Sequence, residues 1–392
     1  MALGIVVAGL TLAGACGVSD DEWEASNTTT TEPLRADDSL LLNEIQVIGT
    51  HNSFHVAPEP TELDLITAMD PEQAIERDYT HRSISEQLID QQVRQLELDV
   101  FVDTDGGLYA DPAFREEAGL GPYEAPGIDE PGIKVLHEQD VDYHTVCPTL
   151  WSCLSEIKTW SDANPDHVPV AVHIQFKDGP LIFDVPGQAV PEKWTSEQMD
   201  ALDAEILDVF PREQILTPAD VLGDHETLNE AVLDGGWPTL GDSRGKVMFL
   251  MINAEPDRSI YLEGHEDLSD RLLFPNAEPG DTDAAYVGVD DPLTDGDRIT
   301  ELVEEGYLVR TRADVPGVQA PAGDPARRDA ALASGAQWVS TDYPGPDGAR
   351  EQFGTPYVAA IPDGLAARCN PVVAPPDCED LLVEPSAVNT GG

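Results

Sequence analysis

Residues 95–102 read QLELDVFV, and residues 169–176 read PVAVHIQF. In both segments every second residue is apolar, which is typical of a β-strand that buries one face. The other face of the first segment carries Glu97 and Asp99. A strand that packs an apolar outer face against helices, while its inner face becomes polar near the carboxyl end, is characteristic of a parallel barrel.

Further apolar runs of strand length flank these two segments, at 45–49, 133–137, 246–252, 286–289, 307–311 and 336–340. Helix-like segments lie between the strands, at 83–93, 149–163, 195–209, 297–306 and 324–334. Alternation of strand and helix predicts a parallel sheet. Eight strands over roughly 320 residues predict an α/β protein with an irregular TIM-type (β/α)8 barrel. We expect the barrel at 43–360, with loop insertions at 104–132 and 253–285, and a C-terminal tail at 361–392.

The amino terminus resembles an export signal. Residues 1–15 (MALGIVVAGLTLAGA) are uncharged and mostly apolar, too short to span a membrane but suited to a signal peptide. The small residues before Cys16 resemble a bacterial lipoprotein cleavage site, which implies a lipid anchor on Cys16 at the outer face of the cell membrane. An ordinary signal peptide with free secretion is the alternative. Residues 16–42 are polar and acidic and predict a disordered tether.

The other four cysteines are Cys147, Cys153, Cys369 and Cys378. An even number in an exported chain indicates two disulfides. Three pairings are possible, and proximity in the sequence favours 147 with 153 and 369 with 378. Two cysteines six residues apart on one helix would lie about 9 Å apart, beyond the reach of a disulfide. We therefore expect Cys147 to precede the helix, with Pro148 in its first turn.

The composition excludes several classes of protein. The chain has 392 residues, with 75 Asp and Glu against 21 Lys and Arg, and a formal net charge of −54. Its hydrophobic fraction of 41% is sufficient for a core and excludes wholesale disorder. The negative charge argues against binding nucleic acid and against electrostatic docking onto anionic lipid.

Three polar clusters follow or occupy the first predicted strands: GTHNSFH at 49–55, Glu97-Leu98-Asp99, and VLHEQD at 135–140. A pair of carboxylates inside a strand is costly unless it is ion-paired or binds a metal, so we treat Glu97 and Asp99 as functional. Carboxylate and amide oxygens are ligands for Ca²⁺ or Mg²⁺. Two histidines supply an acid and a base. A divalent cation with an acid/base pair suits phosphoryl transfer.

These clusters, together with the STDYP stretch at 340–344, resemble the calcium-dependent phosphatidylinositol-specific phospholipase C family, in its bacterial secreted branch. The motifs that carry the resemblance are His51-Asn52, Glu97-x-Asp99, His137 and STDYP, in this order over about residues 43–345. The resemblance implies that Asn52, Glu97 and Asp99 bind Ca²⁺. The chain departs from the family at Gln175, where the family usually has Glu. The neutral amide should weaken metal binding unless Asp178 or a water substitutes.

The resemblance also implies a mechanism. His51 would act as the base near the inositol 2-hydroxyl, and His137 would protonate the departing diacylglycerol oxygen. Attack by the 2-hydroxyl would release a cyclic inositol phosphate, which water can later open. We expect phosphate to be bound by Arg310 or Arg312, with Arg312 favoured because it is closer to the carboxyl end of the strand, and by Lys177.

The remaining aromatic and histidine candidates are less specific. Tyr343 could stack on the sugar ring, with a packed aromatic at a strand end as the alternative. His173 points inward by alternation and is a secondary candidate. We expect the other histidines to be structural or on the surface; these are His55, His81, His144, His167, His225 and His265.

Two other functions remain open. A glycerophosphodiester phosphodiesterase shares the barrel, and Glu97, Asp99, Asp103, Asp105 and His137 fit its pattern nearly as well, whereas His51-Asn52-Ser53 departs from its first motif. A non-catalytic surface lipoprotein is the second alternative, since barrels host many functions. The substrate would be a phospholipid or a soluble inositol phosphodiester. We expect a monomer.

Overall fold

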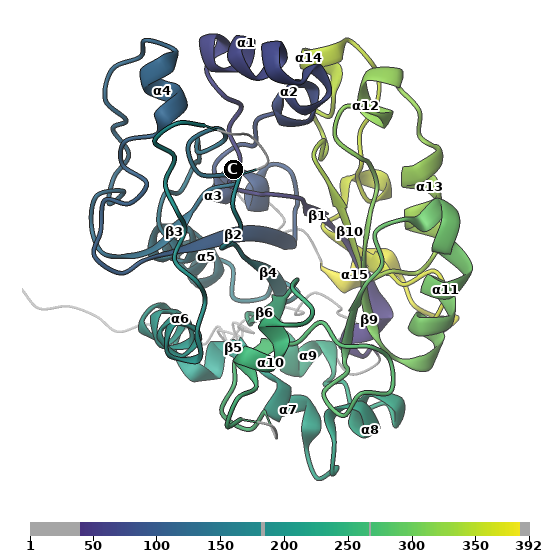
Figure 1. Ribbon diagram of the computed structural model, residues 1–392. Helices are drawn as coiled ribbons and strands as arrows, with labels where there is room; N and C mark the ends of the chain where they lie inside the picture. Colours follow the sequence, from purple (N-terminus) through teal and green to yellow (C-terminus); the bar gives the residue numbers. More distant parts are fainter. Residues whose placement is uncertain (1–39, 182–184, 266–267, 385–392) are drawn as a thin grey trace, which may run out of the picture. The chain divides into compact units, whose positions relative to one another are not determined.

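The computed structural model describes residues 40–181, 185–265 and 268–384. At its centre is a curled sheet of mostly parallel strands, with helices on the outer side (Figure 1). Neighbouring strands follow the order β6 (Val247–Met251), β4 (Val170–Phe176), β2 (Gln95–Asp103), β1 (Ile45–Thr50), β10 (Trp338–Thr341), β9 (Leu308–Arg312) and β8 (Tyr286–Gly288). The predicted signal peptide and the predicted lipid anchor at Cys16 lie outside the described residues.

The ring of strands closes at one weak seam. β7 (Leu273–Phe274) pairs in parallel with β6, and a single parallel bridge between Asn276 and Tyr286 joins it to β8. β5 (Ile215–Leu216) pairs with the beginning of β6. The arrangement confirms the predicted α/β barrel and its irregularity.

One predicted barrel strand is wrong. The segment predicted at 133–137 forms β3 (Gly132–Val135), which pairs antiparallel with β2, whereas β2 pairs directly with β4. A parallel strand would need a long crossover, usually a helix, and only the five-residue α4 (Ala113–Glu117) lies between β2 and β3. β7 takes the missing place in the ring. It lies within the predicted loop 253–285, and its two residues are too few to show an alternating pattern.

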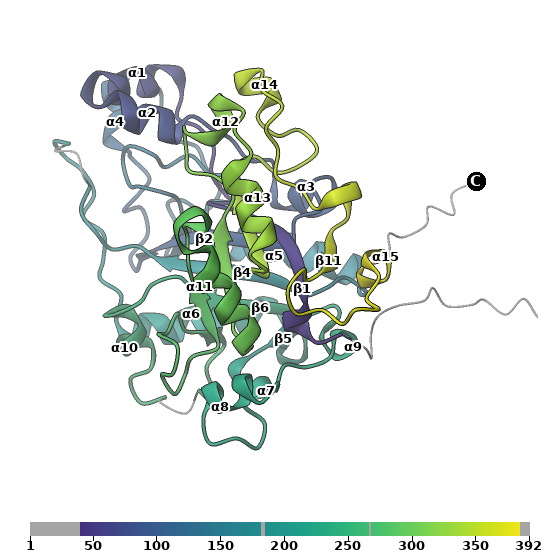
Figure 2. The ribbon, with the colours of Figure 1, turned by 90° about the vertical axis from the view of Figure 1, so that its right-hand side faces the viewer.

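The segment after residue 360 contributes to the sheet. β11 (Ala367–Cys369) pairs antiparallel with β1, with Ile45 opposite Cys369. Figure 2 shows β11 and α15 (Asp380–Val383) beside β1. The described part of the predicted tail therefore packs on the barrel.

The predicted helices form with shifted bounds, as α3 (Ile84–Ile89), α5 (Leu150–Ala163), α6 (Ser196–Val209), α11 (Pro292–Glu305) and α13 (Ala326–Ala333). α3 begins with a capping box of Ser83 and Glu86. α11 ends at Gly306, whose φ of 106° suits glycine.

The sequence did not predict the other helices, which are α1 (Pro60–Met69), α2 (Pro71–Arg77), α7 (Pro218–Leu222), α8 (Leu228–Leu233), α9 (Leu240–Ser243), α10 (Asp257–Tyr261), α12 (Gln319–Ala322) and α14 (Arg350–Phe353). Within the described ranges, no helix is long and apolar enough to cross a membrane.

The core confirms the predicted strand faces. Val172 and Ile174 of β4 and Leu98 of β2 belong to an apolar cluster that also contains side chains of α5 and α6. The opposite face of β4 supplies Ala171 to a second cluster inside the ring, which includes Trp338 of β10. The barrel interior is therefore apolar at this level, and its polar groups lie nearer the carboxyl ends of the strands.

Both predicted disulfides form. The Cys147–Cys153 pair has Cα atoms 5.1 Å apart, and the Cys369–Cys378 pair has Cα atoms 6.1 Å apart. Cys147 precedes α5, as expected. Pro148 does not lie in the first turn, however, because Thr149 is the N-cap and its side chain accepts a hydrogen bond from the backbone of Ser152.

Candidate active site

A tight turn after β1 positions the first polar cluster. Gly49 lies so close to β2 that a Cβ atom there would overlap the side chain of Gln95. Asn52 adopts a left-handed backbone with a φ of 46°, which asparagine tolerates better than most residues. Ser53 then joins this turn to β2, because its hydroxyl accepts a hydrogen bond of 2.8 Å from the backbone N–H of Glu97.

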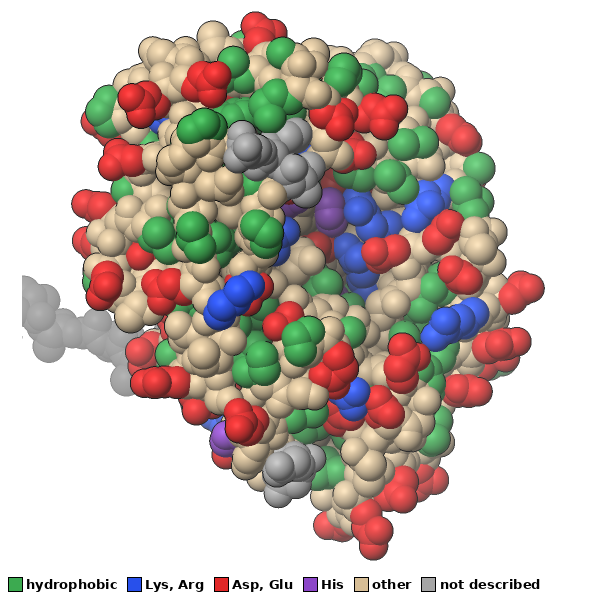
Figure 3. All heavy atoms as spheres, in the orientation of Figure 1, with side chains coloured by type: hydrophobic (Ala, Val, Ile, Leu, Met, Phe, Trp, Pro, Cys, Tyr) green, Lys and Arg blue, Asp and Glu red, His purple; other side chains and the backbone are tan. Residues whose placement is uncertain are grey.

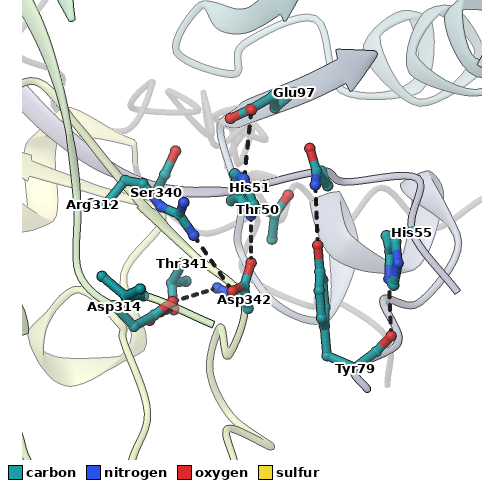
Figure 4. A network of polar contacts seen from close by, with 12 residues as sticks. Thr50, His51, His55, Tyr79, Glu97, Arg312, Asp314, Ser340, Thr341 and Asp342 are labelled. Carbon is teal, nitrogen blue, oxygen red and sulfur yellow. Dashed lines mark hydrogen bonds and ion pairs between the residues drawn. The ribbon is translucent and has the colours of Figure 1, made fainter. Parts of the chain in front are cut away.

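His51 bridges β2 and the end of β10 (Figure 4). Its Nδ1 lies 2.8 Å from Oδ1 of Asp342, and its Nε2 lies 3.9 Å from Oε1 of Glu97. Burial, followed by the positive charge of Arg312, lowers the pKa of His51 well below its usual value. With Nδ1 donating to Asp342, Nε2 presents a lone pair, as a general base requires.

Asp342 is itself held in place. Its backbone N–H donates to Oδ1 of Asp314 at 3.0 Å, and the hydroxyl of Thr341 bonds the other oxygen of Asp314. Arg312 Nη2 lies 3.5 Å from Oδ2 of Asp342. Burial and the neighbouring charge of Asp342 raise the pKa of Asp314 to about 6.

A second histidine–carboxylate pair faces the mouth from the loop after β3. His137 Nδ1 lies 2.7 Å from Oδ2 of Asp142. The Nε2 of the buried His55 lies 2.9 Å from Oδ1 of the same carboxylate. Burial alone would lower the pKa of His137, but the hydrogen bond to Asp142 and its charge outweigh burial and raise it. His137 is therefore disposed to hold a proton.

The carboxylates of β2 face one cation from β9, across the barrel, and one that follows the neighbouring strand β4. Arg310 Nη2 lies 2.5 Å from Oε2 of Glu97, and its Nη1 lies 2.6 Å from Oδ1 of Asp290. Lys177 Nζ lies 3.2 Å from Oδ2 of Asp99. The pairs of Glu97 with Arg310 and of Asp99 with Lys177 are largely shielded from water, so they are screened weakly by salt.

Oxygen atoms suited to a hard cation lie at the same mouth. Oδ1 of Asn52 and both carboxylate oxygens of Asp99 are buried without a hydrogen-bond partner among the described residues. Gln175 lies directly opposite Asp99 in the pairing of β2 with β4. A buried carboxylate with no hydrogen bond is costly, and Lys177, at 3.2 Å, is its ion-pair partner. This donor set of amide and carboxylate oxygens fits Ca²⁺.

The described residues contain one cluster of three histidine or acidic side chains close enough to share a metal ion, formed by His55, His137 and Asp142. It differs from the predicted calcium ligands, which include two amides.

Residues 40–371 match the family described as phosphoinositide phospholipase C, Ca²⁺-dependent. The match spans well over half of the chain. The protein belongs to this family. Its members are phosphoric diester hydrolases, and the predicted family resemblance is confirmed.

Solved structures share the fold. A calcium-dependent phosphoinositol-specific phospholipase C from Pseudomonas sp., in a myoinositol complex, is similar with a TM-score of 0.53 at 17% identity, covering 85% of this chain and 96% of that one. A calcium-dependent phosphatidylinositol-specific phospholipase C from Streptomyces antibioticus gives a TM-score of 0.49 at 20% identity, covering 77% of this chain and 95% of that one. No curated protein sequence matches the chain.

Within this phospholipase C family member, the two predicted phosphate-binding arginines differ. Arg310 is almost fully engaged by Glu97 and Asp290. Arg312 keeps Nε and Nη2 without hydrogen bonds among the described residues, although Nη2 lies 3.5 Å from Asp342. Arg312 is thus the arginine with donors left for an anion.

Two other predicted residues lie deeper than a substrate contact requires. Tyr343 is 5% exposed and packs edge-on against Phe353 and Tyr357, which accounts for it as a packed aromatic. His173 is buried inside the ring against Tyr286 and Trp338. Roles for Tyr343 and His173 in catalysis remain predictions.

Sequence reasoning missed the partners of both catalytic candidates. Asp342 was quoted within STDYP but given no role, and Asp142 lies two residues beyond the quoted VLHEQD stretch. His55 was expected to be structural or on the surface, yet it lies in the same GTHNSFH stretch as His51. Its short spacing from His51 was the available signal.

The mouth contrasts with the rest of the surface. Figure 3 shows a hollow in which Lys, Arg and His side chains gather, while Asp and Glu side chains are spread over the surrounding surface. The site cations identified above are Lys177, Arg310 and Arg312. Such a hollow suits an anionic group even on a chain of net charge −54.

Proposed function

We propose that this protein cleaves phosphatidylinositol or a related inositol phosphodiester, by attack of the inositol 2-hydroxyl on phosphorus, to a cyclic inositol phosphate and diacylglycerol. The observation that carries the proposal is the placement of two histidine–carboxylate pairs at one mouth, with opposite proton preferences. His51 has a lowered pKa and His137 a raised one, which is the division of labour between a base and an acid.

On the base side, His51 takes the proton of the 2-hydroxyl through Nε2. Asp342 holds Nδ1, which fixes the tautomer and stabilises the imidazolium that forms. The hydroxyl oxygen then bonds phosphorus. Because nucleophile and phosphorus belong to one molecule, the attack needs no second reactant to be positioned.

On the acid side, His137 gives a proton to the diacylglycerol oxygen as its bond to phosphorus breaks. Asp142 holds Nδ1 of His137, so the proton transferred is the one on Nε2. Arg312 and Lys177 neutralise the phosphate oxygens as negative charge develops.

Asn52, Glu97 and Asp99 would hold Ca²⁺, with Gln175 at the position where the family usually has Glu. The ion, when bound, supplies positive charge that lowers the pKa of the attacking hydroxyl and stabilises phosphate oxygens. Glu97 would offer Oε1, because Oε2 is already bound to Arg310. Lys177 would release Asp99 and become available to the phosphate. Mg²⁺ is the less fitting ion, since it demands strict octahedral geometry.

The test is a product analysis. Purified protein with Ca²⁺ should convert phosphatidylinositol to cyclic inositol phosphate, detected by phosphorus NMR, and a chelator should stop the reaction until Ca²⁺ is restored. The His137→Ala variant is the matched control and should lose at least about a hundredfold in rate. Release of glycerol phosphate from deacylated phosphodiesters would instead support a glycerophosphodiester phosphodiesterase. Binding without turnover would support a surface lipoprotein.

We further propose that the protein is exported and acts as a monomer. The two disulfides support export, because such bonds persist in oxidising compartments. A lipid anchor on Cys16 is part of this proposal, and mass spectrometry of the mature amino terminus from membranes tests it. A mature chain without a diacyl group on Cys16 would leave free secretion.

A further inference from the structure

The loop after β3 and the turn after β1 share one buried carboxylate. Asp142 has a side chain with no exposed surface, and it accepts from two imidazoles at once. His137 reaches Oδ2 at 2.7 Å, while His55 Nε2 lies 2.9 Å from Oδ1 and 3.0 Å from Oδ2. Arg77 Nε is a more distant neighbour, 3.6 Å from Oδ2.

His55 is anchored on its other side as well. Its Nδ1 lies 3.0 Å from the backbone oxygen of Tyr79, and its ring stacks on the Tyr79 ring at a centroid distance of 4.1 Å. Its backbone N–H donates to the oxygen of Asn52, and its backbone oxygen accepts from His81. His55 is thus fixed by backbone and ring contacts.

Both ring nitrogens of His55 face groups that only accept, a carbonyl oxygen and a carboxylate. The ring is therefore held between the Tyr79 carbonyl and the Asp142 carboxylate. Its Nε2 lies within hydrogen-bond distance of both oxygens of Asp142, and Oδ2 also faces Nδ1 of His137. The two rings meet edge to face, with centroids 5.8 Å apart.

We propose that His55 is a positioning residue for the acid step: acting through Asp142, it fixes the orientation of the His137 imidazole that protonates the leaving oxygen. The inference rests on the proposed function. His55 itself touches neither the substrate nor the reacting atoms. Its removal would take away one of the two imidazoles that hold Asp142, and would so loosen the carboxylate and the ring of His137 with it.

The same three side chains could in principle bind a transition metal. Their nitrogen–oxygen distances of 2.7–3.0 Å are those of charge-assisted hydrogen bonds, and the ring nitrogens point at the carboxylate oxygens. A metal among them would need those bonds to break. The geometry therefore favours a hydrogen-bonded chain in which His55 and Asp142 position His137.

Two variants of His55 separate its two contacts. In His55→Asn the amide can replace Nδ1 and keep the bond to Tyr79, but it is too short to reach Asp142. In His55→Gln the longer amide can replace Nε2 and donate to Asp142, while the bond to Tyr79 is lost. His167→Gln is the matched control, since His167 is also buried and bonds through both nitrogens, to Ser161 and to the oxygen of Val168.

The readout is the leaving group. Phosphatidylinositol releases an alkoxide that needs protonation, whereas the nitrophenyl ester of inositol phosphate releases a weakly basic aryl oxide that does not. His55→Asn should lower kcat on phosphatidylinositol about tenfold to a hundredfold with KM unchanged, and should lower the nitrophenyl rate less than about threefold. His55→Gln should stay within about threefold on both substrates, and His167→Gln should not change the ratio between them.

Equal losses on the two substrates, or a larger loss for His55→Gln than for His55→Asn, would overturn the inference and leave His55 a purely structural residue. Circular dichroism and thermal unfolding identify a variant that fails to fold. If His55→Asn fails, His55→Phe, which keeps the stacking on Tyr79 without any donor, replaces it with the same expected ratio. Absence of turnover by the wild-type protein would refute the proposed function instead.

Discussion

The two histidine–carboxylate pairs at the mouth are alike in composition and opposite in character. In each pair, Nδ1 of the histidine lies close to a buried carboxylate. The distance is 2.8 Å from His51 to Asp342 and 2.7 Å from His137 to Asp142. Burial and Arg312 lower the pKa of His51, whereas burial acting on His137 is outweighed by Asp142, which raises its pKa.

The difference shows that the groups around a histidine, and not the residue type, set its pKa and so decide whether it carries a proton. Arg312 and Arg310 add positive charge beside His51 and act with burial to lower its pKa. Asp142 is held by His137 and His55, with Arg77 farther away at 3.6 Å, and its hydrogen bond and charge raise the pKa of His137. One mouth can therefore hold a base and an acid of the same residue type.

The largest expected effect is a loss of rate that depends on the substrate for His137 but not for His51. His51→Ala should lower the rate at least about a hundredfold on both phosphatidylinositol and the nitrophenyl ester, since both need the 2-hydroxyl deprotonated. His137→Ala should lose as much on phosphatidylinositol but less than about tenfold on the ester. Steady-state kinetics on both substrates measure this, and His225→Ala, at the surface, is the control. Equal losses for both variants on both substrates would erase the distinction between the pairs.

Calcium sharpens the comparison because its predicted ligands lie around His51. Asp99→Asn should raise the Ca²⁺ concentration for half-maximal activity at least about tenfold, because a charged ligand is lost. Gln175→Glu should lower it by less than about tenfold, and Mg²⁺ should substitute poorly. Calorimetry and activity titrations measure both variants. Asp103→Asn, on the same strand but paired with Lys134, is the control and should leave the titration unchanged. An unchanged titration for Asp99→Asn would remove this residue from the calcium site.

The pH profile tests the acid side. A raised pKa keeps His137 protonated to higher pH, so activity should fall as pH rises through that pKa. Asp142→Asn removes the charge that raises the pKa of His137, so the alkaline limb of kcat/KM should move to lower pH. Profiles on folded protein measure the shift. Asp270→Asn, in the surface pair with His265, is the control. An alkaline limb that stays in place would mean that another group limits the rate at high pH.

The smallest effect concerns stability and uses a third kind of histidine. Burial lowers the pKa of His167 to about 4, and its ring nitrogens bond to Ser161 and Val168 instead of a carboxylate. Below pH 6.5 the unfolded chain binds a proton that folded His167 refuses until about pH 4. The free energy of unfolding should therefore decrease as the pH is lowered from 6.5 to about 4, by up to about 3 kcal/mol from this residue. Denaturant unfolding of His167→Gln should show a shallower fall; an equally steep fall would assign the loss to other groups.

Local patterns were enough for much of the fold. Alternation along 95–102 and 169–176 identified β2 and β4 and the face that carries Glu97 and Asp99, because side-chain period is a property of the strand itself. Proximity in sequence was enough to pair the cysteines. It was not enough for β3, whose direction depends on a partner strand, or for β7, which is too short to have a pattern.

The candidate site divides in the same way. The sequence by itself determined which side chains follow the strands, including His51, Asn52 and His137, and hence the chemistry available at the mouth. Asp142 lies five residues after His137, but only the tertiary structure decided which carboxylates hold His51 and His55. Asp342 is 291 residues from His51, and His55 reaches Asp142 across 87 residues. Pairings over such distances depend on strand order and side-chain direction in space, which no local sequence pattern encodes.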